Sequence, residues 1–187
     1  MAERVVFHVD ANSAFLSWSA AYRVQVLGEE LDLRTVPSVV AGDKESRHSI
    51  ILAKSGPAKK YGIQTGEPLF LALEKCPDLK IVEPDYGLYV ECSRHFVEVL
   101  RQFSPVVEQY SIDEAWVDMT GTERLYGAPR LAAEQMRKRI YEELGFTVNV
   151  GIRATNSLPR WQEILKSRTR CIRFFRRKYP PKCGPFR

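Results

Sequence analysis

The chain has 187 residues, 44% of them hydrophobic, which is enough for one domain or one and a half around a packed core. No apolar run approaches the ~20 residues of a membrane-spanning helix. MAERVVFHVD at the N-terminus has no signal-peptide features, so we expect no membrane association and no leader. The four cysteines show no C-x-x-C spacing, which disfavours structural zinc and a disulfide framework and is typical of a cytoplasmic protein.

The positive charge of the chain is confined to one segment. The formal net charge is +5, yet residues 157–187 alone contain ten Lys or Arg and one Glu. Residues 1–156 contain 18 basic and 22 acidic residues, so their net charge is −4. The body of the chain therefore does not indicate a basic surface for nucleic acid, whereas its last 31 residues do.

The first predicted elements are a strand and a helix. Residues 4–10, RVVFHVD, form an apolar strand that ends in a carboxylate. The helix that follows lies within residues 12–25, with Asn12 as its predicted N-cap. Its apolar residues recur at helical spacing: Phe15, Trp18, Ala21 and Tyr22.

Residues 14–78 contain a series of short elements. Residues 35–42 and 48–54 are predicted to be a strand pair, because both are apolar and a polar segment joins them. Residues 56–68 are basic and rich in turn residues, and 69–76 form a short helix that a proline ends. We expect this part of the chain to be a small lobe inserted into the main domain.

The rest of the body alternates strands and helices in a recognisable order. The predicted elements are strand 78–85, helix 86–103, strands 105–111 and 114–120, helix 128–145 and strand 146–152. This order is the ferredoxin-like pattern. It predicts an α+β fold, an antiparallel sheet with helices on one face, to which the N-terminal strand is added. The second helix is expected to bury a face made of Leu131, Met136, Ile140 and Leu144.

One predicted strand carries adjacent carboxylates that burial alone does not explain. In YSIDEAWVDM, residues 110–119, Asp113 and Glu114 stand at the tip of the predicted hairpin, and Asp10 ends the first strand. Strand ends of this topology can be neighbours, and three converging carboxylates repel one another unless a cation lies between them. Oxygen ligands suit Mg²⁺, and two such ions support in-line nucleotidyl transfer. An Asp-Glu pair beside a turn is also commonly solvated, so the residues alone leave both interpretations open.

Two motifs carry a resemblance to a known family. VVFHVDANSAF and YSIDEAWVDMTG resemble the catalytic motifs of the Y-family DNA polymerases, of the DinB/UmuC type, and the segment between them resembles the fingers of that family. The resemblance runs from Arg4 to Asn156. It implies a palm formed by residues 1–13 and 79–156, with a fingers lobe at 14–78.

The resemblance also implies a metal site. Asp10, Asp113 and Glu114 match the metal-binding carboxylates of the family, and they are our expected catalytic residues. The backbone carbonyl of Ala11 matches a further metal ligand. The implied cofactor is a pair of Mg²⁺ ions.

Two further residues match positions that contact the nucleotide. Phe15 matches the aromatic steric gate that excludes ribonucleotides, although a core residue on an amphipathic helix would look the same. Lys59 lies where the family usually has an Arg that contacts the triphosphate, although it could equally be a solvated surface lysine. Two departures concern nucleotide affinity: Gly56 stands in place of a common Tyr, and Ala14 in place of a common aromatic residue.

The function that the resemblance implies is translesion DNA synthesis. The expected partners are damaged primer–template DNA and a deoxynucleoside triphosphate. The resemblance also implies a sliding clamp as a partner of the intact family, and we expect the clamp-binding motif to be absent from this chain. Two alternatives are a non-catalytic polymerase-like protein that binds DNA or other partners, and a nucleotide cyclase built on the same palm. The fingers-like insertion at 14–78 disfavours the cyclase.

The resemblance stops after Asn156. Residues 157–187 are rich in Arg, with Trp161, Phe174 and Phe175 interleaved, as in a basic tail that binds nucleic acid. However, allowed codons for this segment, read from the third base of the Ser157 codon, can encode a sequence that resembles the continuation of the family. We therefore expect a frameshifted tail on a truncated chain without thumb and little-finger domains, which would be improbable as a polymerase on its own.

Overall fold

The computed structural model describes residues 4–43 and 49–155. They form two compact units, residues 4–12 with 93–155 and residues 13–43 with 49–92. The predictions for the tail at 157–187, including the frameshift, lie outside the described residues. Within the described ranges, no helix is both long and apolar enough to cross a bilayer.

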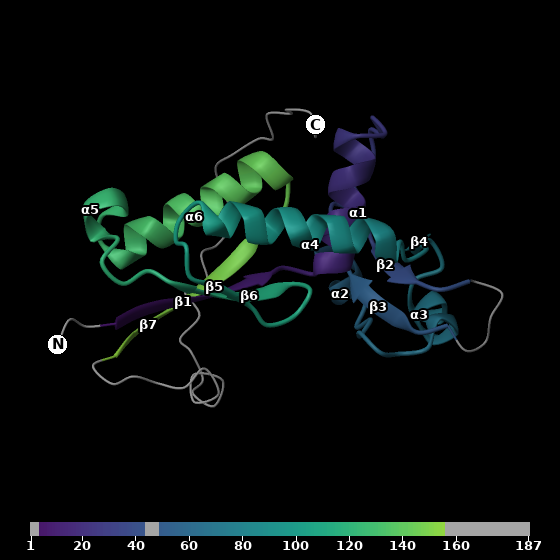
Figure 1. Cartoon of the computed structure of the whole chain (residues 1–187). Helices are drawn as coiled ribbons and strands as arrows, with labels where there is room; N and C mark the ends of the chain where they lie inside the picture. Colours follow the sequence, from purple (N-terminus) through teal and green to yellow (C-terminus); the bar gives the residue numbers. More distant parts are fainter. Residues whose placement is uncertain (1–3, 44–48, 156–187) are drawn as a thin grey trace. The chain divides into compact units, whose positions relative to one another are not determined.

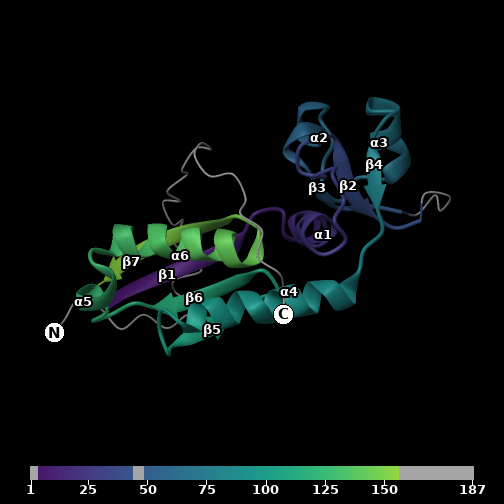
Figure 2. The ribbon, with the colours of Figure 1, turned by 90° about the horizontal axis from the view of Figure 1, so that it is seen from above.

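A four-stranded antiparallel sheet forms the centre of the first unit, with strands in the order β5-β6-β1-β7. The strands are β1 (Arg4–Ala11), β5 (Val107–Gln109), β6 (Glu114–Asp118) and β7 (Val148–Thr155). One face of the sheet is covered by α6 (Pro129–Leu144), after the short α5 (Glu123–Tyr126), and by the part of α4 (Tyr86–Arg101) in this unit (Figure 1, Figure 2). The predicted α+β class, with helices on one face of an antiparallel sheet, is therefore confirmed.

One strand pairs differently from the prediction. The strand expected at 78–85 does form, as β4 (Lys80–Val82), but it pairs in parallel with β2 (Ser38–Ala41) in the second unit. The prediction that it opens the ferredoxin-like motif is therefore wrong. The motif runs β1, α4, β5, β6, α6, β7, with the other sheet inserted after β1. Local periodicity identifies a strand, whereas tertiary packing chooses a partner far away in the chain.

One face of the first sheet is apolar, whereas the opposite face is mixed and carries the buried Val6 and Trp116 beside polar residues. Phe7 and Val9 of β1 and Val117 of β6 are fully buried, as expected for the row of side chains that faces the helices. His8 and Asp10 alternate with them on β1, so they belong to the opposite face, and both are only partly buried. The carboxylate that ends β1 therefore lies on the face that the two helices leave open.

Helix α6 follows its predicted limits but not its whole predicted face. Proline occupies its first turn, and Gly145 ends it with φ 73°, a left-handed conformation that glycine adopts without strain. Leu131, predicted to be buried, is 52% exposed, because it lies five residues before Met136 and so roughly 140° around the helix. Small residues complete the inner face instead, and the buried set is Ala132, Ala133, Met136, Ile140 and Leu144.

The second unit is built on a three-stranded sheet in the order β3-β2-β4, in which β3 (Ile51–Lys54) pairs antiparallel with β2, as predicted. Its helices are α1 (Ala14–Gln25), α2 (Gly56–Lys60) and α3 (Leu69–Lys75). One buried cluster joins strand residues to α2 and α3, and includes Val39, Ile51, Ala58, Leu69 and Ala72. A second cluster joins the sheet to α1, and includes Leu16, Ala20, Val40, Ala53 and Val82. Both faces of this small sheet are therefore packed.

Candidate active site

The antiparallel pairing of β1 and β6 brings the acidic strand ends together. Asp10 and Glu114 are Cα partners in the register, so they lie opposite each other on the same face of the sheet. One residue further, the backbone N–H of Ala11 donates to the carbonyl oxygen of Asp113 at 3.0 Å. The structure thus brings together the backbones of the three acidic residues and of Ala11 that the sequence singles out.

The side chains of Asp113 and Glu114, at the start of β6, each contact another polar side chain. Glu114 Oε2 lies 3.3 Å from Nε2 of His8, and Asp113 Oδ1 accepts a hydrogen bond of 2.8 Å from the hydroxyl of Ser111. In the described part of the chain, no three Asp, Glu, His or Cys side chains are grouped closely enough to form a ready metal site. This arrangement is expected of carboxylates that repel one another and turn to the nearest donors.

The electrostatics of Asp10 are those of a carboxylate that lacks compensation. Burial, together with repulsion from Glu114 and Asp113, raises its pKa from 3.8 to about 6, while His8 acts in the opposite direction. A cation bound between these carboxylates would remove the repulsion and favour the charged form of Asp10. Carboxylate and carbonyl oxygens are ligands that Mg²⁺ and other hard divalent cations accept. The donor set therefore fits a divalent metal ion.

Hydrogen bonds of Asn12 connect the end of β1 to β7 and to the residue that precedes it. Asn12 donates from its backbone N–H to the carbonyl oxygen of Thr147 at 3.0 Å, and from Nδ2 to the hydroxyl of Thr147 at 3.1 Å. The amide of Asn149 donates to Asn12 Oδ1 at 2.7 Å, and Asn149 stands opposite Asp10 in the register. The prediction that Asn12 caps α1 is wrong, because its side chain is engaged here. Ser13 holds the N-cap position instead, with φ 48° and no side-chain cap.

Asn149 was not predicted from the sequence. The available signal was a polar residue in the middle of the apolar strand FTVNVGI, where a side chain facing an open sheet edge or a site is the usual explanation. Periodicity alone does not say which. Only the β1–β7 register places it beside the end of β1.

Phe15 lies in the second unit, in an aromatic cluster. Its ring is stacked on that of Tyr89, with centroids 4.7 Å apart and an interplanar angle of 23°, and it meets Trp18 edge-on at 6.1 Å. Burial raises the pKa of Tyr89, whose hydroxyl is 3.0 Å from that of Ser19. Trp18 and Tyr89 are fully buried, whereas Phe15 keeps an accessible part. Its partial exposure is compatible with both predicted roles, so the gate stays a prediction.

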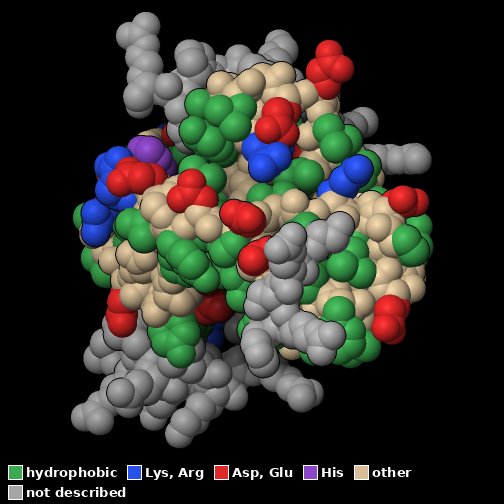
Figure 3. Space-filling view, turned by 90° about the vertical axis from the view of Figure 1, so that its right-hand side faces the viewer, with side chains coloured by type: hydrophobic (Ala, Val, Ile, Leu, Met, Phe, Trp, Pro, Cys, Tyr) green, Lys and Arg blue, Asp and Glu red, His purple; other side chains and the backbone are tan. Residues whose placement is uncertain are grey.

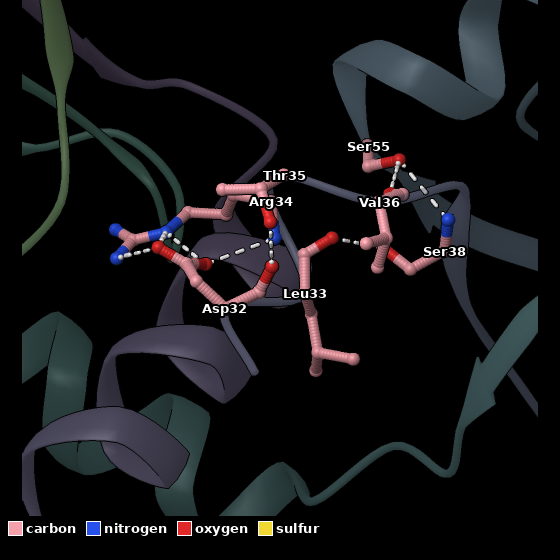
Figure 4. A network of polar contacts seen from close by, with 7 residues as sticks. All are labelled: Asp32, Leu33, Arg34, Thr35, Val36, Ser38 and Ser55. Atoms are coloured by element: carbon pink, nitrogen blue, oxygen red, sulfur yellow. Dashed lines mark hydrogen bonds and ion pairs between the residues drawn. The ribbon is translucent and has the colours of Figure 1, made fainter. Parts of the chain in front are cut away.

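Lys59 lies exposed on α2, and a polar network holds the start of that helix (Figure 4). Ser55 is the N-cap: its hydroxyl accepts from the N–H of Ala58 at 3.1 Å and donates to the carbonyl of Val36 at 2.7 Å. The same oxygen accepts from the N–H of Ser38 at 3.1 Å, which ties the turn before β2 to the helix. The short helix that carries Lys59 is therefore fixed at its beginning, while the role of Lys59 stays a prediction.

On the face seen in Figure 3, acidic side chains of the described residues are more frequent than basic ones, and neither kind covers the face continuously. Hydrophobic side chains are interspersed there with separate acidic and basic ones. This agrees with the nearly balanced charge of residues 1–156. A phosphate-binding surface of the kind that a basic cluster forms is therefore not evident on that face.

Comparison with known proteins identifies the family. Residues 9–160 match the impB/mucB/samB family. The chain is 49% identical to DNA polymerase IV of Clostridium acetobutylicum over 155 residues, covering 83% of this chain and 38% of that protein. It is 34% identical to DNA polymerase IV of Alkaliphilus oremlandii over 181 residues, covering 97% of this chain and 44% of that protein. The chain thus spans less than half the length of these relatives.

Solved structures agree on the fold. DinB from Sulfolobus solfataricus matches 80% of this chain with a TM-score of 0.65 at 24% identity, and the chain covers 42% of that protein. The insertion ternary complex of Dbh DNA polymerase matches 80% of this chain with the same TM-score at 23% identity. The sequence motifs, the architecture and the family match all agree. The chain therefore belongs to the impB/mucB/samB family, that is, to the Y-family DNA polymerases, which use divalent metal ions.

Proposed function

We propose that this chain provides the palm and fingers of a translesion DNA polymerase. The reaction is the template-directed transfer of a deoxynucleotide from its triphosphate to the 3′-OH of a primer, with release of pyrophosphate. The observation that carries the proposal is the register that sets Asp10 against Glu114, with Asp113 adjacent and the pKa of Asp10 raised to about 6. Because the chain spans less than half of its relatives, we assign the activity to the complete enzyme and expect none from these 187 residues alone.

In this proposal, the carboxylates of Asp10, Asp113 and Glu114 and the carbonyl of Ala11 hold two Mg²⁺ ions. Metal ions held there would supply activation of the attacking hydroxyl and stabilisation of the charge that develops on the phosphates. The chain contributes the positioning of these ligands. Strand β1 sets Asp10 in a half-buried place, where an uncompensated carboxylate is destabilised, so binding a cation there is favoured.

The proposed nucleotide contacts come from the second unit. Phe15 would exclude a ribose 2′-OH, since an aromatic ring held by stacking on Tyr89 cannot easily move aside. Lys59 would bind the triphosphate as a point charge from α2, whose beginning is fixed by Ser55. The second unit, which includes β4, would then act as the fingers, and the unit built on the β5-β6-β1-β7 sheet as the palm.

The proposed partners follow from the reaction. They are primer–template DNA, including damaged DNA, a deoxynucleoside triphosphate and, in the complete enzyme, a sliding clamp. Since the substrate is genomic DNA, we also propose that the protein works in the cytoplasm.

The test is a chimera. Residues 4–156 of this chain replace the matching segment of the Clostridium acetobutylicum relative, and primer extension is measured with and without Mg²⁺. We expect Mg²⁺-dependent extension that Asp113→Asn lowers by a factor on the order of 10³. A chimera that folds and binds primer–template DNA, but extends no primer, would contradict the proposal and favour the non-catalytic DNA-binding alternative.

A further inference from the structure

A polar cluster, made of the buried Ser93 and the exposed Gln109, connects helix α4 to the turn that carries Asp113. Ser93 of α4 is only 4% exposed, and its hydroxyl donates to the carbonyl oxygen of Ile112. The side-chain amide of Gln109 donates both to Ser93 Oγ and to the carbonyl oxygen of Ser111, each at 3.0 Å. Two consecutive carbonyl groups of the turn, those just before Asp113, are therefore held by side chains from a helix and from β5.

The turn itself is closed by further hydrogen bonds. The N–H groups of Tyr110 and Ser111 both donate to the carbonyl oxygen of Glu114, at 3.0 and 3.2 Å. The hydroxyl of Ser111 donates to Asp113 Oδ1 at 2.8 Å. The orientation of the Asp113 carboxylate is thus linked through the 110–113 turn to Ser93, on the other side of that turn.

We propose that Ser93 and Gln109 are positioning residues for Asp113. This inference rests on the proposed function, in which Asp113 is a metal ligand. Neither side chain needs to touch the substrate or the metal. Their effect is to hold the turn in the one arrangement that presents Asp113 next to Asp10 and Glu114, since partners behind a metal ligand fix its orientation and affect metal affinity.

A second buried serine that bonds to β6 provides a matched control. Ser104 is also 4% exposed, donates to a β6 carbonyl, that of Asp118, and accepts from the N–H of Val106 at 3.2 Å. It therefore resembles Ser93 in burial and in chemistry. However, it lies at the opposite end of β6, away from Asp113. Removing either hydroxyl leaves a carbonyl group without its partner and destabilises the fold to a similar degree, but only Ser93 is linked to the 110–113 turn.

The experiment compares Ser93→Ala with Ser104→Ala in the full chain, with Mn²⁺ as a paramagnetic probe of the metal site. Mn²⁺ binding is measured by electron paramagnetic resonance, and stability is measured by thermal unfolding. Hydrogen exchange is followed at the amides of Tyr110 and Ser111. We expect both variants to lose similar stability. Only Ser93→Ala should weaken Mn²⁺ binding, by roughly 10- to 100-fold, and speed exchange in the turn. Gln109→Ala should change Mn²⁺ binding in the same direction, and combining it with Ser93→Ala should add little, because both act on one turn.

The outcomes separate the inference from the proposed function. If the unchanged protein binds Mn²⁺ and Ser93→Ala binds it as well as Ser104→Ala does, the positioning role is wrong while the metal site stands. If the unchanged protein binds no Mn²⁺ at millimolar concentration, the proposed function fails and the inference fails with it. Should Ser93→Ala not fold, the exposed Gln109→Ala decides: Mn²⁺ affinity and turn exchange equal to those of Ser104→Ala would overturn the positioning role.

Discussion

The two ends of the β1–β6 ladder place carboxylates in opposite environments. At one end, burial acts to raise the pKa of Asp118, but hydrogen bonds from Thr120 and the guanidinium of Arg4, 2.9 Å away, outweigh it and lower the pKa. At the other end, Asp10 faces a second carboxylate, that of Glu114, and its pKa rises to about 6. Both aspartates lie on the same two strands, so the secondary structure does not explain the difference. The partners do: a carboxylate with a cationic partner stabilises a fold, whereas an uncompensated one indicates a site for a ligand.

The largest expected effect is on activity, and it should differ between substitutions at the two ends of the β1–β6 ladder. In the chimera described above, Asp10→Asn should lower Mg²⁺-dependent primer extension by a factor on the order of 10³ or more, because a metal ligand is lost. Asp118→Asn should change the extension rate by less than about tenfold, since Asp118 acts on the fold. Equal losses in the two variants would remove the distinction between the two ends of the ladder.

The stabilisation of the chain by Mg²⁺ should depend on the carboxylates at the Asp10 end of the ladder and not on Asp118. Mg²⁺ at about 100 times its dissociation constant should raise the free energy of unfolding of the chain by about 2.7 kcal/mol. The gain should vanish in Asp113→Asn and persist in Asp118→Asn, when both are unfolded with urea at several Mg²⁺ concentrations. A gain of the same size in Asp113→Asn would place the bound ion elsewhere.

The pH dependence of stability should have opposite signs at the two ends. The folded-state pKa of Asp10, about 6, exceeds its value of 3.8 in the absence of these interactions, so its contribution destabilises the fold above about pH 6 and disappears as the pH falls towards 4. The free energy of unfolding of the unchanged protein, relative to that of Asp10→Asn, should therefore increase as the pH is lowered from 6 to 4. Urea unfolding of both proteins across this range, without metal, measures it. A flat difference would mean that the pKa of Asp10 is not raised.

The smallest effect concerns the Arg4–Asp118 pair. The folded-state pKa of Asp118 is lowered, so its stabilising contribution is present above its ordinary value of 3.8 and is lost as the pH falls below it. At pH 7, Asp118→Asn should cost about 1 kcal/mol, since the pair is partly exposed and screened by solvent. The difference from the unchanged protein should shrink below about pH 4, and urea unfolding of the two proteins at pH 7 and pH 3 checks this.

The sequence contained enough information to identify most of the elements and to select the acidic residues of the candidate site. Pro129 and Gly145 delimit α6, and short apolar segments identify β1 and β6, because capping and strand preference act over a few residues. The motifs containing Asp10, Asp113 and Glu114 identified the family. None of this required knowledge of which residues are neighbours in space.

Tertiary structure alone decided which of these residues are partners. Glu114 meets His8 and Asp118 meets Arg4 across 106 and 114 positions of the chain. Sequence periodicity extends over only a few residues, so it does not predict contacts across such separations. Ion pairing and pKa depend instead on distance in space and on burial. For the same reason, the predictions that β4 belongs to the first sheet and that Asn12 caps α1 were wrong. Likewise, no sequence pattern indicated that Ser93 bonds to the turn before Asp113. Short-range energies determined the elements, and long-range contacts determined what the acidic residues can do.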